Sequence, residues 1–139
     1  MTPEQLHLVR ETWQRIGDVG DPVAMLFYER LFEIDPTSRM LFAKADPAAQ
    51  RSKLLQALGI IVADLERPDA LAPVLQSMGR RHLAYGVRRR HYDSVCDALL
   101  WSFERGLGDD WTDEVQEAWD RAYTLVSEIM KGAAEGSPG

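Results

Sequence analysis

The sequence predicts an all-α fold, an irregular sandwich of six or more helices in a single domain. Two observations predict it. Apolar residues recur at helical spacing along the whole chain, and no segment shows the alternation typical of a strand. Prolines, capping residues and glycines divide the chain into segments of unequal length, some of them very short. Such segments fit an irregular sandwich better than an up-down four-helix bundle, and 139 residues suffice for one ordinary core.

Capping signals predict the first two helices. Residues 2–5 supply an N-cap threonine, a first-turn proline and a capping-box glutamine, so we expect a helix from Pro3 to about Ile16. Asp21 and Pro22 repeat the start signal, and this second helix must stop or bend before Pro36. Its expected buried face consists of Ala24, Met25, Tyr28, Leu31 and Phe32.

Prolines delimit the middle of the chain. We expect a short turn over residues 36–42, a loop at Asp46, a helix over 47–66, a break at Pro68 and a helix capped by Asp69 and closed by Gly86. The buried face of the helix expected over residues 47–66 lies within an arc of roughly 80° and consists of Gln50, Leu54, Leu58, Ile61 and Leu65. A polar residue, Gln50, therefore lies at the start of an otherwise apolar helical face.

Two longer helices are predicted in the last third of the chain. They cover about 90–106 and, after the cap Thr112, about 113–130. The arginine run at 88–90 is expected to be a solvated loop. We assign residues 1–132 to the folded domain and expect residues 133–139 to form a disordered tail.

Composition excludes several classes of protein. The net charge of -6 argues against a nucleic-acid-binding protein, which needs a basic stripe. The chain shows no signal peptide and no apolar run long enough to span a bilayer, so we expect a cytoplasmic protein without membrane insertion. The single cysteine, Cys96, excludes an internal disulfide and a cysteine-based zinc cluster, and its apolar neighbours predict a buried structural thiol.

His82 is the most informative residue, because it interrupts an apolar helical face. That face spans roughly 100° at helical pitch and consists of Leu71, Val74, Leu75, Met78, His82 and Tyr85. Burying an imidazole costs free energy unless a partner satisfies its nitrogens. The partner is either a core hydrogen-bonding group or a metal such as a haem iron, and the residues alone favour the core histidine.

Four ordered motifs lie between residues 26 and 92, and the resemblance that they carry extends from Trp13 in the first helix to the last helix near Met130. They are LFYERLF with Tyr28, DPTSRMLF with Pro36 and Phe42, QRSKLLQALG with Gln50 and Leu54, and GRRHLAYGVRRRHY with His82 and Tyr92. With these motifs the sequence resembles the globin family, and within it the single-domain bacterial globins of the Vitreoscilla type, the globin domain of flavohaemoglobins and Hell's Gate globin. The resemblance implies a globin fold of about six to eight helices around a haem pocket.

The resemblance also implies a role for individual residues. His82 would be the proximal ligand of haem b, iron protoporphyrin IX, and Tyr28 and Gln50 would be the distal pair that binds dioxygen, with Leu54 as the apolar wall beside the gas. The remaining cofactor-binding positions expected are Phe42, Lys53, Met78, Arg81, Tyr85, Val87 and Tyr92. Lys53, Arg81 and Arg88 are alternative candidates for the cation that meets the anionic haem propionates, and helical periodicity does not choose among them. The residues alone favour a simpler interpretation, in which Tyr28 is a core aromatic whose hydroxyl reaches a backbone carbonyl and Gln50 is an exposed first-turn residue.

The haem chemistry agrees with these roles. Iron held by one imidazole keeps its sixth position open, and a phenol and an amide can donate to dioxygen bound there. No histidine occurs between Arg10 and Arg81, which excludes bis-histidine ligation from the distal helix. His7 is expected on the surface, and His91 is exposed, hydrogen-bonded or in contact with a haem propionate. Flavohaemoglobins pair the tyrosine that matches Tyr92 with a glutamate; Glu135 is the nearest by count but lies in the tail, so a peroxidase-like proximal site is not implied.

Reversible binding of dioxygen, carbon monoxide and nitric oxide is the function that this pattern favours. One alternative is an enzyme, a nitric oxide dioxygenase, which would need a separate reductase as partner because the chain has no dinucleotide-binding fingerprint. The other alternative is a gas or redox sensor domain, or a haem-free stress sensor of globin fold; the lack of an output domain argues against the first, and His82 argues against the second.

Overall fold

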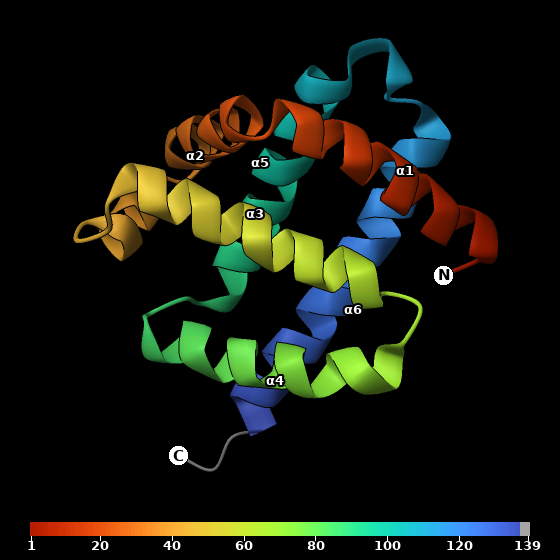
Figure 1. Ribbon diagram of the computed structural model, residues 1–139. Coiled ribbons are helices and arrows are strands. Elements are labelled where there is room, and N and C mark those ends of the chain that lie inside the picture. The colour runs from red at the N-terminus through yellow and green to blue at the C-terminus, as the bar shows by residue number, and fades with distance from the viewer. Residues whose placement is uncertain (137–139) are drawn as a thin grey trace.

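Six α-helices and two 3₁₀ helices make up residues 1–136, the part of the chain that the computed structural model describes (Figure 1). In order they are α1 (Pro3–Val19), α2 (Asp21–Ile34), η1 (Pro36–Phe42), α3 (Pro47–Asp64), α4 (Pro68–Ala84), α5 (Arg89–Leu107), η2 (Gly108–Asp110) and α6 (Asp113–Gly136). No strand occurs over these residues. The predicted all-α class is therefore confirmed, and in Figure 1 α5 and α6 pass behind α3 and α4.

Side-chain caps begin three of the helices at the predicted positions. The Thr2 hydroxyl accepts from the backbone N–H of Gln5 at 3.1 Å, and the Gln5 side chain accepts from the backbone N–H of Thr2 at 3.0 Å. Asp46 accepts from the N–H of Ala49 at 3.0 Å. Thr112 accepts from the N–H of Val115 at 3.2 Å. These bonds satisfy donors that the first helical turn leaves without a partner, so short sequence signals locate the helix starts.

Four local predictions are wrong. α1 continues past Gly17 to Val19 and ends at Gly20, whose φ of 57° is unfavourable for other residues. Asp69 is not the cap of α4, because Arg67 occupies that position and Asp69 lies in the first turn. The arginines expected in a loop instead start α5. α6 continues to Gly136 through Ala133 and Ala134, which favour helix. Residues 133–136 of the expected tail are thus helical, and residues 137–139 lie outside the described residues.

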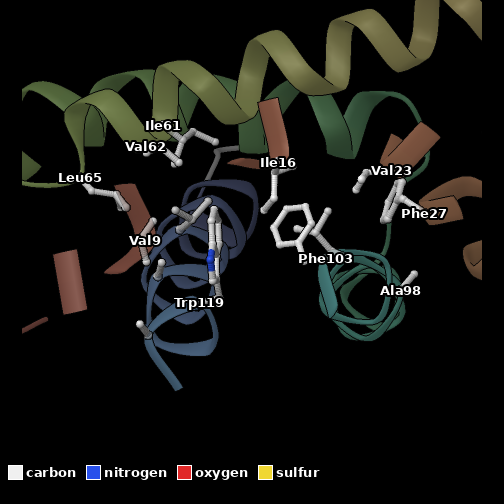
Figure 2. Close-up of a cluster of buried hydrophobic side chains, with 14 of the residues drawn as sticks. Val9, Ile16, Val23, Phe27, Ile61, Val62, Leu65, Ala98, Phe103 and Trp119 are labelled. Carbon is white, nitrogen blue, oxygen red and sulfur yellow. The ribbon is translucent and has the colours of Figure 1, made fainter. Parts of the chain in front are cut away.

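All six α-helices contribute to one hydrophobic core, which includes Ile16, Phe103 and Trp119 (Figure 2). The Trp119 and Phe103 rings meet edge to face with centroids 4.8 Å apart, and the indole N–H of Trp119 donates to Thr12 at 2.9 Å. The one buried polar atom of this tryptophan is therefore satisfied. No helix in residues 1–136 is long and apolar enough to cross a membrane.

α4 packs closely on α6 and only lightly on α3. At the crossing with α6, Gly79 lies so close to the backbone of Met130 that any Cβ would overlap it. Few residues of α3 meet α4 directly. The space between these two helices is where the candidate site lies.

Candidate functional site

A cavity of about 330 Å³ opens between α3 and α4 and is backed by α2, α5 and α6. Its volume falls in the range of small-molecule and cofactor sites, roughly 300–1,000 Å³. The walls are mostly apolar and carry a few polar groups, among them Tyr28, Gln50, His82 and His91. A cavity of this kind can hold a large, largely apolar ligand and orient it through a few directed contacts.

His82 contributes the α4 side of the cavity. Its Nδ1 lies 2.7 Å from the carbonyl oxygen of Met78, one turn earlier in the same helix. A carbonyl can only accept, so Nδ1 carries the hydrogen and Nε2 keeps its lone pair. Burial lowers the pKa of the His82 imidazole, although the Met78 carbonyl opposes this shift. The imidazole is therefore neutral near pH 7 and has the protonation pattern of a metal ligand.

Tyr28 of α2 and Gln50 of α3 contribute a second polar group to the same cavity. The amide Nε2 of Gln50 donates to the Tyr28 hydroxyl oxygen at 3.2 Å. Because that oxygen accepts from Gln50, the phenolic hydrogen remains free to donate elsewhere. Burial raises the pKa of the Tyr28 phenol more than the Gln50 hydrogen bond and the Arg51 charge lower it, so the group stays protonated.

Aromatic packing fixes the position of Tyr28. Phe27 and Phe42 meet the Tyr28 ring edge to face, at centroid distances of 4.8 and 5.3 Å. Phe42, at the end of η1, also lines the cavity. These contacts hold the phenol against α3 and limit its freedom to swing away.

The other residues predicted for the site divide into two groups. Leu54, Met78, Val87 and Tyr92 line the cavity, as does Lys53, whose overall exposure places it at the mouth. Arg81, Arg88 and Tyr85 do not line it, and the Tyr85 side chain is 70% exposed. Val74, predicted on the same buried face, is exposed as well, and so is Met25 of α2. Helical periodicity identifies the correct face of α4, but no neighbouring helix in residues 1–136 covers the edge of that face, where Val74 and Tyr85 lie.

The far wall of the cavity includes Tyr92 of α5. Its backbone carbonyl accepts a hydrogen bond from the Tyr123 hydroxyl, and burial raises the pKa of the Tyr92 phenol. Glu135 forms an ion pair with Arg89, on the protein surface. The carbonyl of Met78, not a carboxylate, is thus the group that orients His82.

His91 is buried, so the exposed alternative is wrong. Its Nδ1 accepts from the backbone N–H of Arg88 at 2.8 Å, which leaves the hydrogen on Nε2. Burial is the main cause that lowers the pKa of this imidazole. Because His91 lines the cavity, its Nε2–H is a neutral hydrogen-bond donor in the cavity wall. The sequence alone did not decide between this position and an exposed one.

Several cavity residues were not predicted. Leu58 was placed on the right face of α3, and its spacing of four residues from Leu54 was a usable signal for the site. Leu99 of α5 and Val126 of α6 gave no such signal, because only long-range packing brings them to the cavity.

Cys96 is half-buried, and burial with three nearby aspartates raises its pKa to about 12, which agrees with an unreactive thiol.

Comparisons with known proteins agree with this architecture. A family model described as Globin matches residues 26–130. A flavohemoprotein of Rhizobium meliloti is 31% identical over 134 residues, which is 95% of this chain and 33% of the relative. Neuroglobin of Danio rerio is 26% identical over 88% of this chain and 86% of its own length. The chain thus spans about a third of the length of the flavohemoprotein it matches.

A solved structure is also similar. An engineered carbene transferase from Rhodothermus marinus, described as a nitric oxide dioxygenase, superposes with a TM-score of 0.85 at 26% identity. The match covers 97% of this chain and 94% of that one.

Proposed function

The chain belongs to the globin family, and on this premise we propose that it is a haem protein that reversibly binds dioxygen and other diatomic gases. The observation that carries the proposal is one cavity with a neutral imidazole on one side and a phenol–amide pair on the other. In it His82 would hold the iron, and Tyr28 with Gln50 would meet the gas.

The cavity fits haem b in three respects. Its apolar walls suit a porphyrin, and Nε2 of His82 has the free lone pair that iron ligation requires. Lys53 at the mouth supplies a cation for a propionate. The chain has one cysteine, whereas the covalent attachment motif of c-type haem needs two, so the cofactor would be held without covalent bonds.

When bound, a haem with one imidazole ligand supplies an open position at which diatomic gases bind. Tyr28 would donate its free hydrogen to the gas, and Gln50 would hold the phenolic oxygen so that this hydrogen points into the cavity. Leu54 and Phe42 would exclude water from the same space. Donors of this kind favour dioxygen, which takes on negative charge, over carbon monoxide.

Nitric oxide dioxygenation is the second candidate, and the similarity to flavohemoproteins and to the Rhodothermus marinus protein favours it. The pocket residues would be the same, since dioxygen must be held before nitric oxide reaches it. The reaction would turn nitric oxide and dioxygen into nitrate at the expense of one electron from the iron, so a reductase would have to supply that electron again.

The visible spectrum of the purified protein tests the proposal. Haemin titration should reach one equivalent per chain, and the reduced protein should change spectrum with carbon monoxide and reversibly with dioxygen. A protein that takes up no haemin would refute haem binding. Nitrate formation from nitric oxide with an added reductase, measured per electron supplied, then separates a dioxygenase from a simple carrier.

A further inference from the structure

Positive charge is concentrated in one segment of this acidic chain. Residues 70–92 contain five of the 16 lysines and arginines and none of the 22 aspartates and glutamates. The arginines lie at the end of α4 and the start of α5, on both sides of the turn that holds Tyr85 and Gly86. Residues 70–92 are therefore strongly basic, although the whole chain has a net charge of -6.

Helix stability does not account for the arginines that start α5. Helix N-termini carry partial positive charge and favour acidic residues, by roughly 0.3–1 kcal/mol each. The first turns of α1, α2, α4 and α6 contain acidic residues, and α3 has an acidic N-cap, Asp46; α5 has no acid in its first turn and Arg88 at its N-cap. Of its three initial arginines, Arg89 pairs with Glu135. Among residues 1–136, Arg88 and Arg90 form no ion pair.

Exposed apolar side chains lie beside these charges. Tyr85 is 70% exposed and Met40, on η1, is 80% exposed. η1 adjoins the turn, because the Leu41 side chain approaches Gly86 and Arg90 donates to the Thr37 hydroxyl at 3.1 Å. Arginine, tyrosine and methionine are the residue types enriched in protein interfaces. We call the surface formed by Met40, Arg81, Tyr85, Arg88 and Arg90 the basic face.

The basic face lies next to the cavity. Arg81 precedes His82 on α4, and Val87 and His91, which line the cavity, flank the arginines of α5 (Figure 1, turn between α4 and α5). We propose that the basic face is the docking surface for a small acidic protein that transfers single electrons. This proposal rests on the proposed haem function, because the electron needs an acceptor in the cavity.

The exchange is balanced by one electron. The partner's centre loses one electron and is oxidised, the iron in the cavity goes from ferric to ferrous, and no proton or group moves. The arginines would steer the acidic partner and orient it, and Tyr85 with Met40 would provide the dry contact at its centre.

A plant-type [2Fe–2S] ferredoxin, an acidic one-electron protein, serves as the probe. The holoprotein in the ferric state is mixed without oxygen with the reduced ferredoxin, and the ferrous spectrum is followed by stopped flow. The variant Arg88→Glu with Arg90→Glu is compared with a control of equal charge change, Arg67→Glu with Arg121→Glu, whose side chains are exposed away from the turn. Fluorescence anisotropy of labelled oxidised ferredoxin measures docking independently of electron transfer.

We expect the face variant to slow reduction by about tenfold or more at low salt and to weaken docking in parallel, within the range of steered association. The control should stay close to wild type, and added salt should remove the difference. An equal loss of reduction rate in both variants would show a net-charge effect and overturn the proposal. Unchanged reduction rates in the face variant would also overturn it, as would binding of the basic face to anionic vesicles but not to ferredoxin. A holoprotein that forms normally and binds carbon monoxide separates these outcomes from a failure of the haem assignment.

Discussion

The hydrogen bond between Gln50 and Tyr28 sets the size and the order of the expected effects on dioxygen release. Gln50 donates to the Tyr28 oxygen at 3.2 Å, so the phenol is the group left to donate into the cavity. Tyr28→Phe removes that donor. A hydrogen bond to a charged acceptor is worth roughly 1.5–3 kcal/mol, which corresponds to about tenfold to a hundredfold in affinity.

Gln50→Leu should have a smaller effect. It leaves the phenol in place, held by Phe27 and Phe42, but removes the donor that orients the phenolic oxygen. The two substitutions act on one hydrogen-bonded unit, so the double variant should lose less than the sum of the single losses. Most of the change should appear in the dissociation rate, because the entrance to the cavity is unaltered.

Stopped-flow mixing of the oxygenated protein with carbon monoxide measures that rate. Carbon monoxide affinity is the internal control, because this gas develops less negative charge and should respond far less. Gln56→Leu is the matched control for the amide, since Gln56 is exposed on the same helix and bonds only weakly to Ser52 at 3.5 Å. If neither substitution changes the rate of dioxygen release, or if Gln50→Leu accelerates release more than Tyr28→Phe, Tyr28 is not the main donor to the gas.

Three further outcomes test the site and its packing. His82→Ala should lose the native haem spectrum, and added imidazole should partly restore it; native-like ligation in the variant would disprove the assignment. Because burial lowers the pKa of His82, the folded apo-protein binds fewer protons than the unfolded chain, so its free energy of unfolding should fall below about pH 6.5. Urea unfolding of wild type and His82→Gln at about pH 5 and about pH 8 should show a shallower loss in the variant. Gly79→Ala should destabilise by about 1–3 kcal/mol, because the new Cβ overlaps the Met130 backbone. Gly132→Ala, with open space around it, should stabilise instead, and thermal unfolding of both checks the contrast.

Local chemistry decided which parts of the fold could be predicted from the sequence. Thr2, Asp46 and Thr112 each bond to the first turn of the helix they precede, so the start of each helix was predictable. The end of α6 was not, since a glycine within a helix and a glycine beyond it look alike in sequence. Asp69 resembled a cap, but the preceding Pro68 already fits the first position of the helix.

The candidate site was predictable in part for the same reason. The order of the motifs indicated Tyr28, Gln50 and His82, and the structure brings all three to one cavity. Helical phase placed Tyr85 on the His82 face, but whether another helix covers that edge depends on tertiary packing, and none does. The carbonyl of Met78 as the partner of His82 follows from backbone geometry, and no side-chain pattern records it.

The features assigned to function are also those that reduce stability. The cavity removes packing contacts from α3 and α4, a buried imidazole and phenol lose hydration, and arginines start α5 against its dipole. Where α1 meets α5 and α6 the core has no comparable defect, since the Trp119 indole N–H donates to Thr12 and the Trp119 ring meets Phe103 edge to face. A cofactor bound in the cavity would restore the missing contacts on every helix that lines it, α2 to α6, and binding to the folded state adds to its stability. Removal of haem should therefore increase amide hydrogen exchange most in α3 and α4, which the cavity separates, and least in α1, which does not line the cavity.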